Sequence, residues 1–481
     1  MRLGLLARSR EAADRSPWWP MLRAHGCEPV VLGPRGSAGP GPQAPQPHES
    51  LDLVLCLDAA AAEELSERPV ADILLVHCGE RQDASDRPPG FRSLGRGDPS
   101  IRVGIHLVRQ AGPGRRVLAE DTAPIYNDDT LPNIAARVDE LARALFPKAL
   151  AAWSSGAPAI EELQPGVPPR SQDPGWAGRA VLAGRLLARR VARALAPRQL
   201  AKSALFAFAL GCARPVRDLW RTLRRRHPVR IFTYHRVSSL CRDGMTVSPQ
   251  VFERQLRYLE RSHDLTPLPE ALRALASGTR LRRPIGVVTF DDAYRSVVTT
   301  AWPLLQARRA PAACFATTGL VDTDNRFPHD AANPLRPYFG VMTWAELTDL
   351  RDSGWTIGAH SLTHARLSTC ALPHLEHELA DPPRDLRTHL GVTGDVLAYP
   401  FGGIDDLGPE ARGILPRYGY TACLSNFGGE NFPGVDPLQL RRIDLGGNHP
   451  NLAWKAWAHG VDFSLLRRGW TRLRRSVSRA S

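Results

Sequence analysis

Long hydrophobic runs are missing from this chain of 481 residues. No stretch of about 18 apolar residues occurs, and this excludes a membrane-spanning helix. The first residues (MRLGLLARSREAADRS) contain too short an apolar region for a secretory signal and lack a small-residue cleavage pattern. We therefore expect the protein to be cytoplasmic.

Paired cysteines are missing as well. The chain has eight cysteines but no Cys-x-x-Cys pair, and most of them lie in or beside apolar runs. A disulfide framework is not expected without a secretory signal. We interpret these residues as free thiols that pack as small hydrophobic side chains.

Acidic residues are fewer than basic ones, and the formal net charge is +13. Residues 165–230 hold fifteen basic residues against two acidic ones, an excess as large as that of the whole chain. Such a basic segment suggests an anionic surface as its partner. A nucleic acid is not expected, because neither a recognition fold nor an aromatic stacking platform accompanies the charge.

The basic segment also has a helical pattern. Arginines recur every four residues over 178–195 opposite leucines, which predicts a basic amphipathic helix, and an apolar stretch follows at 203–213. That stretch is too short to span a bilayer. It either lies at the inner face of an anionic membrane or packs on a domain with its arginines in solvent, and both interpretations stay open.

The length of the chain exceeds one ordinary core, so two or three domains are expected. We expect a smaller α/β domain at 1–153, a Pro-rich linker with the basic helical segment at 154–228, a barrel at 229–450 and a basic tail at 451–481. In the first domain, strands are predicted at 2–7, 29–33, 52–57, 73–77 and 101–108, and a helix is predicted at 132–150.

Seven short apolar runs in the second half each end on a polar residue. They are 230–235, 285–291, 311–316, 355–360, 396–401, 419–424 and 439–444. Most are separated by enough residues for a crossover helix, so they predict a parallel sheet that closes, or nearly closes, into a distorted (β/α)7 barrel. In such barrels the chemistry lies at the C-terminal ends of the strands.

These strand ends carry a set of metal-binding side chains. Asp291 and Asp292 follow one buried run, and two carboxylates there are costly unless a cation or a proton lies between them. His360 and His364 follow another run at a four-residue spacing. Two imidazoles and one carboxylate suit zinc or a neighbouring divalent ion and leave positions for water and substrate.

The segments TFDD (289–292), HSLTH (360–364) and AYPFGG (398–403) resemble, in order, the motifs of the polysaccharide deacetylase domain (NodB homology, carbohydrate esterase family four), over residues 229–447. The resemblance implies hydrolysis of the N-acetyl group of an amino sugar in a glycan. It implies Asp291 as the general base and Asp292, His360 and His364 as ligands of one divalent ion. Zinc is the first expectation for that ion, with cobalt, nickel or manganese as alternatives.

Two positions depart from the family pattern. The late Leu-x-His motif reads LRRIDL at 440–445 without a histidine, so we expect His235, at the end of the first strand, to be the acid, with His449 as the alternative. No arginine precedes the Pro-aromatic pair. Arg442 could orient the base instead, and we place it with Tyr399, Pro400 and Phe401 in the substrate-binding group.

Residues 50–147 resemble a second family. Segments at 73–77, 88–92, 97–98, 103–106 and 124–130 are similar to motifs of formyltransferases of the methionyl-tRNA type, which implies a Rossmann-like α/β fold. Leu75 occupies the position of the catalytic asparagine, and the late Asp-x-Gly reads Gly112-Pro113-Gly114. We therefore interpret this domain as degenerate and kept for binding or assembly.

Three functions remain open from the sequence. The first is a metal-dependent sugar deacetylase, and the second is a deformylase or a bifunctional enzyme acting on N-formyl and N-acetyl sugars. The third is a non-catalytic glycan-binding protein. The complete set of two aspartates and two histidines argues against the third function.

Overall fold

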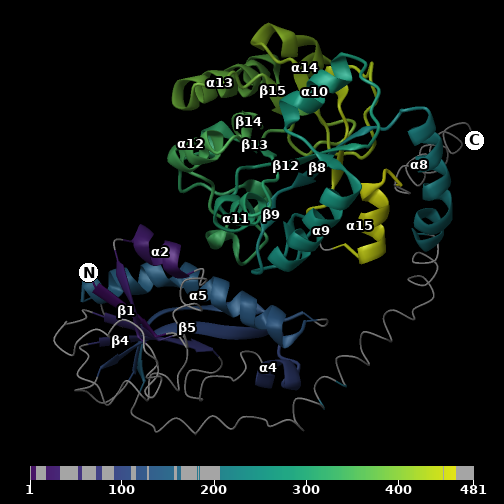
Figure 1. Cartoon of the computed structure of the whole chain (residues 1–481). Coiled ribbons are helices and arrows are strands. Elements are labelled where there is room, and N and C mark those ends of the chain that lie inside the picture. Colours follow the sequence, from purple (N-terminus) through teal and green to yellow (C-terminus); the bar gives the residue numbers. More distant parts are fainter. Residues whose placement is uncertain are drawn as a thin grey trace, which may run out of the picture. The chain divides into compact units, whose positions relative to one another are not determined.

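The computed structural model describes residues 2–6, 18–25, 27–32, 53–56, 72–78, 91–109, 115–126, 129–156, 160–163, 181, 184, 206–447 and 449–461. The chain divides into two compact units, Met1–Ala194 and Leu195–Ser481, each with its own sheet (Figure 1). Within these ranges, no helix is long and apolar enough to cross a membrane. The predicted helix at 178–195, apart from Val181 and Gly184, and the tail beyond residue 461 lie outside the described residues.

The second unit is a barrel of parallel strands, as the seven apolar runs predict. Each run contains one strand, and the order in the sheet is β16-β15-β14-β13-β12-β8-β17. A parallel bridge between Leu424 and Leu440 joins the two edges, so the barrel is nearly closed. The strands are β8 (Val229–Tyr234), β12 (Ile285–Phe290), β13 (Ala312–Ala316), β14 (Thr356–Ala359), β15 (Val396–Ala398), β16 (Ala422–Leu424) and β17 (Arg442–Asp444).

Helices surround this sheet (Figure 1). They include α9 (Pro249–Ser262), α10 (Leu268–Ala276), α11 (Trp302–Gln306), α12 (Trp344–Asp352), α13 (Leu372–Leu390), α14 (Pro409–Ile414) and α15 (Asn451–Ala458). Their ends follow local sequence signals. Ser248 caps the start of α9, Thr343 and Glu346 form a capping box on α12, and α13 ends at Gly391 with a left-handed φ of 67°.

The interior of the barrel is filled by alternate residues of its strands, since successive side chains of a strand point to opposite faces. Leu268, Ala271 and Leu275 of α10 belong to the same core cluster. The strand residues of this cluster include Val229, Ile231, Ile285, Val287, Ala313, Phe315, Val396, Ala398, Ala422 and Leu424.

The first unit has one seven-stranded sheet in the order β2-β1-β3-β4-β5-β6-β7. Strands β1 to β4 run parallel to one another, whereas β4, β5, β6 and β7 pair antiparallel. The described elements are β1 (Arg2–Leu6), α2 (Trp18–Ala24), β2 (Glu28–Leu32), β3 (Leu53–Cys56), β4 (Asp72–Cys78), α4 (Phe91–Arg96), β5 (Ser100–Arg109), β6 (Arg115–Pro124), α5 (Leu131–Ser154) and β7 (Glu161–Leu163). The five predicted strands and the predicted helix are present.

The structure corrects the sequence-based boundaries at two places. Glu161–Leu163, expected in the linker, pairs with β6 as strand β7, and β6 itself was not predicted because it begins with polar residues. Residues 451–458, expected in the tail, form α15 and pack on the barrel, since Trp454 is 2% exposed and meets the ring of Tyr258 edge to face at 5.2 Å. Apolar burial therefore extends the barrel unit past residue 450.

Gly358 on β14 provides a test of the barrel packing. A Cβ at this position would lie 2.6 Å from the ring of Phe315 and 2.8 Å from the carbonyl oxygen of Val396. We expect Gly358→Ala to lower the free energy of unfolding by about 1–3 kcal/mol through overpacking, measured by denaturant titration. The control is Gly413→Ala on α14, where nothing lies within 4 Å of the new Cβ. Equal stability of both variants would contradict the packing described.

Candidate active site

Two adjacent aspartates follow strand β12 inside the barrel. Asp291 is 2% exposed and Asp292 is 0% exposed. The backbone turns sharply here, because Asp292 (φ 68°) and Ala293 (φ 51°) both adopt the left-handed conformation that residues other than glycine rarely take. The two carboxylates consequently have different partners: Asp291 pairs with Arg442, and Asp292 faces His360 and His364.

Asp292, His360 and His364 form a candidate metal centre. The Oδ1 atom of Asp292 lies 3.3 Å from Nε2 of each histidine, and the three ligand atoms lie within 4.8 Å of one another. Nδ1 of His360 is 2.5 Å from the carbonyl oxygen of Ala398, which can only accept, so this nitrogen carries the proton and Nε2 presents its lone pair. Among the described residues, none donates a hydrogen bond to either buried oxygen of Asp292. A cation would satisfy all three groups, so the residues fit a divalent ion.

The pKa shifts of His360 and Asp292 also indicate that this site attracts positive charge. Burial lowers the pKa of His360, but Asp291 and Asp292 more than offset this, so that its pKa is raised. Burial raises the pKa of Asp292, yet His364 and His360 hold it well below its ordinary value. The carboxylate is therefore ionised and the site attracts a proton or a metal ion.

The loop that carries both histidines is held by Glu378 from α13. This fully buried carboxylate accepts hydrogen bonds from the backbone N–H groups of Leu362 and Thr363, each at 3.0 Å, and from the hydroxyl of Thr363 at 2.5 Å. Ser361 (φ 61°) and His364 (φ 66°) are left-handed, so the loop is tight. Glu378 thus stabilises a strained turn that brings His364 back beside His360.

Asp291 forms a bidentate ion pair with Arg442 of β17. The two N–H···O distances are 2.7 and 2.6 Å, and the guanidinium also donates to the carbonyl oxygen of Ser425 at 2.8 Å. Burial raises the pKa of Asp291, but Arg442 first and His360 next outweigh it, so the pKa is lowered. Arg442 is fully buried, and its guanidinium is committed to these groups, so it positions the base instead of contacting substrate, which corrects its place in the substrate-binding group.

The candidate base and two of the candidate ligands line one cavity of about 220 Å³. His235, at the end of β8, lines the same cavity, as does Asp444. His449 is not among the lining residues and packs instead edge to face against Trp457 at 4.6 Å. The structure therefore places His235, and not His449, where an acid could reach a leaving group. The full lining is His235, Met245, Asp291, His329, His360, His364, Tyr399, Phe401, Gly402, Asn426 and Asp444.

The polysaccharide deacetylase family model matches residues 279–422, which include Asp291, Asp292, His360 and His364. The poly-beta-1,6-N-acetyl-D-glucosamine N-deacetylase of Staphylococcus aureus (strain MSSA476) is 25% identical over 198 residues. The match covers 40% of this chain and 66% of that protein, just under two thirds of its length.

Two solved structures are similar to parts of the chain. IcaB from Ammonifex degensii is 25% identical with a TM-score of 0.40, covering 48% of this chain and 97% of that one. A sugar N-formyltransferase from a Shewanella species is 14% identical with a TM-score of 0.26, covering 36% of this chain and 75% of that one.

Aromatic residues after β15 form one wall of the cavity. Phe401 is 46% exposed, left-handed (φ 63°) and in edge contact with the ring of His364 at 5.0 Å. Tyr399 is buried, and its hydroxyl donates to the carbonyl oxygens of Gly402 and Gly403. An exposed ring beside a metal centre can stack on a sugar, so Phe401 is the member of the predicted substrate-binding group best placed to do so. Pro400 is buried and does not line the cavity.

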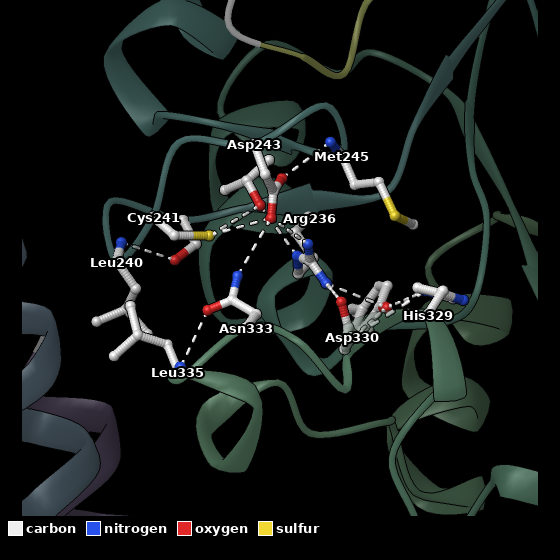
Figure 2. A network of polar contacts seen from close by, with 12 residues as sticks. Arg236, Leu240, Cys241, Asp243, Met245, His329, Asp330, Asn333 and Leu335 are labelled. Carbon is white, nitrogen blue, oxygen red and sulfur yellow. Dashed lines mark hydrogen bonds and ion pairs between the residues drawn. The ribbon is translucent and has the colours of Figure 1, made fainter. Parts of the chain in front are cut away.

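Sequence reasoning missed a network of polar contacts that includes Arg236, Asp330 and His329 (Figure 2). Arg236 follows the candidate acid His235, and its side chain is 2% exposed. Its guanidinium donates to Asp330 at 2.5 Å, to Asp243 at 2.7 Å and to the hydroxyl of Thr246 at 2.9 Å. One buried cation therefore holds together two loops that are far apart in the sequence.

This network leads to His329, which lines the cavity. The hydroxyl of Tyr294 donates to Asp330 at 2.6 Å and lies 2.9 Å from Nε2 of His329 (Figure 2). Because the single hydroxyl proton points to Asp330, Nε2 of His329 acts as the donor to Tyr294. This nitrogen is also 3.8 Å from Oδ2 of Asp292. His329 thus lies next to Asp292 of the candidate metal centre.

Little in the sequence marks these additional residues. His329 lies in a short 3-10 helix (Pro328–Asp330), and Met245 directly precedes the two-residue strand β10 (Thr246–Val247). Neither follows a barrel strand, so the barrel argument does not select them. Glu378 does carry a signal, because it lies three residues after Leu375 on the buried face of α13, where a carboxylate needs partners.

Metal binding by the candidate metal centre can be tested directly. We expect Asp292→Ala, His360→Ala and His364→Ala each to lose the bound divalent ion, because each removes one of three protein ligands. Metal content after dialysis and zinc titration calorimetry would measure this. His377→Ala, on the exposed face of α13, should bind metal as the unaltered protein does. Unchanged metal content in any of the three ligand variants would refute the assignment.

The ion pair of Arg442 with Asp291 predicts a pH effect. The reaction needs ionised Asp291 and is lost as pH falls through its pKa, which the arginine lowers. Arg442→Met removes the largest influence that opposes burial, so the pKa of Asp291 should rise and the acidic limb of kcat/KM should move to higher pH, whereas Arg442→Lys should move it less. Removing one partner of a buried pair also costs about 3–5 kcal/mol of stability.

The control for that experiment is Arg441→Met, the exposed neighbouring arginine, whose pH profile should stay in place. An unmoved acidic limb in a folded Arg442→Met variant would show that this pair does not set the ionisation of the base.

Proposed function

We propose that this protein is a metal-dependent N-deacetylase that hydrolyses the N-acetyl group of an amino sugar in a glycan. The observation that carries the proposal is the cavity that joins the Asp292–His360–His364 centre to the ionised base Asp291. The family match of residues 279–422 and the likeness to a staphylococcal N-deacetylase support it.

Zinc is the proposed ion, because two imidazoles and one carboxylate are a common zinc ligand set with open positions. When bound, such an ion polarises the amide carbonyl and lowers the pKa of water, which an unreactive amide requires. Asp291 does not face the ion's ligands but the guanidinium of Arg442. It therefore stays ionised and takes the proton of the attacking water.

His235 is the proposed acid for the leaving amine. It lines the cavity beside Asp291, and its Nδ1 atom is buried without a hydrogen-bond partner. Imidazole is the side-chain group suited to proton exchange near neutral pH. Asp291 and His235 would thus divide the proton transfers between them, one on the water and one on the nitrogen.

The proposed substrate is an N-acetylglucosamine-containing polysaccharide, or a lipid-linked or soluble precursor of one. The name of the staphylococcal relative supports β-1,6-linked chains as the first candidate. Phe401 offers the exposed ring on which a sugar could stack at the mouth of the cavity. The proposed location of the reaction is the cytoplasm, where such precursors are made.

A panel of N-acetyl and N-formyl glucosamine oligosaccharides tests this proposal. We expect release of acetate, abolished by a chelator and restored by zinc. Asp291→Asn should keep its metal while turnover falls by roughly 10²–10⁴-fold, the usual contribution of a general base. Asp264→Asn, an exposed acid outside the cavity, is the matched control.

Other outcomes would redirect the assignment. Release of formate alone would make the protein a deformylase. Loss of metal together with activity in Asp291→Asn would show that the two aspartates have been assigned in the wrong order. Full turnover in His235→Gln would remove that histidine from the mechanism.

A further inference from the structure

The helix that precedes the barrel presents its charged face to the protein. Residues 206–223 are helical, with π-helical geometry at Ala209–Ala213 followed by α8 (Arg214–Leu223). Arg217 donates to the carbonyl oxygen of His459, which caps α15, at 2.6 Å. Arg221 forms a bidentate ion pair with Glu430 at 3.0 and 2.7 Å. These bonds fix the rotation of α8 on the barrel unit.

The opposite face of the same helix is apolar and exposed. Val216 (71% exposed), Leu219 (62%), Trp220 (49%) and Leu223 (76%) follow one another at spacings of three and four residues, so they form one stripe. Phe208 (63%) extends the stripe two helical turns toward the N-terminus. We call these five residues the α8 apolar face.

This arrangement is the reverse of an ordinary surface helix, which buries its apolar stripe and exposes its charges. Contiguous exposed apolar patches on soluble proteins mark interaction sites. Among the described residues, no side chain covers the α8 apolar face to any large extent, as its exposure shows.

The charges around the α8 apolar face indicate its partner. Arg224, Arg225 and Arg226 follow Leu223 directly and are exposed, and the guanidinium of Arg224 lies over the ring of Trp220 at 4.5 Å. Asp218, the one acid in the sequence of this helix, is bound by Arg214 and Arg217. Arginine and tryptophan beside an apolar stripe are typical of helices that lie in the headgroup region of an anionic bilayer.

A second copy of the chain fits this surface less well. Burying two such faces against each other would bring two clusters of exposed arginines together, and like charges at an interface oppose association. An anionic bilayer satisfies the apolar stripe and the arginines at once.

We propose that the α8 apolar face binds the surface of an anionic lipid bilayer and attaches the barrel unit to it. The helix lies in the interface with Leu219, Trp220 and Leu223 among the acyl chains and the following arginines at the lipid phosphates. The bonds of Arg217 and Arg221 to the barrel make the attachment rigid. This proposal does not depend on the chemistry of the active site.

The test is co-sedimentation of the full chain with vesicles of phosphatidylcholine alone and of phosphatidylcholine mixed with phosphatidylserine. We expect binding to the mixed vesicles that weakens with salt, because each basic residue near an anionic surface contributes about fivefold to partitioning. Leu223→Glu should lower partitioning at least about tenfold, since it replaces a buried apolar side chain by a charge. Leu372→Glu, the same change at an exposed leucine of α13, should have no effect.

Three further measurements distinguish an anionic bilayer from a second copy of the chain, or from other protein, on the α8 apolar face. Thermal unfolding of Leu223→Glu without lipid should match that of the unaltered protein, and a clear loss of stability would show that other protein covers this face. Light scattering that finds a dimer dissolved by Leu223→Glu would identify a second copy as the occupant. Equal partitioning into both vesicle types, or binding that Leu223→Glu leaves unchanged, would overturn the proposal.

Discussion

The two buried carboxylates after β12 determine most of what the barrel has to provide. Adjacent negative charges repel strongly where water is excluded, and each therefore needs its own source of positive charge. Asp291 receives it from the guanidinium of Arg442, while Asp292 faces two imidazole nitrogens and no hydrogen-bond donor. The different partners give the aspartates different chemistry: one remains an ionised base and the other can hold a metal ion.

Much of this site could be predicted from the sequence because parallel strands bring distant residues to one edge. Asp291 and His360 each follow a fully buried or nearly buried strand, and the register of β12, β13 and β14 places them at the same end of the barrel. The types of side chain at this end of the barrel then limit the reactions that the site can support. The seven apolar runs sufficed to predict the barrel, because each was long enough to bury one strand.

The features that escaped prediction depend on contacts between segments far apart in the sequence. His329 reaches the cavity because buried Arg236 holds its loop through Asp330, and nothing local marks that pairing. The orientation of α8 was likewise hidden, since the partners of its arginines, Glu430 and the carbonyl of His459, lie more than 200 positions away. Periodicity identifies the two faces of a helix but not which face the protein will bind.

The place of Arg442 on the last barrel strand has a consequence for synthesis on the ribosome. Strand β17 pairs with β8, the first strand of the barrel, and β8 pairs with β12. The arginine that pairs with Asp291 therefore lies on the barrel strand that is translated last. Domains are made from their N-terminus, and a nascent chain that has released only β8 to β16 holds an acid without its guanidinium. Such a chain would hold Asp291 without the guanidinium that lowers its pKa most. Asp291 would thus gain its ion pair only once the barrel has been completely translated. A truncated product that ends before β17 would carry all three candidate metal ligands and still lack the arginine that pairs with the base.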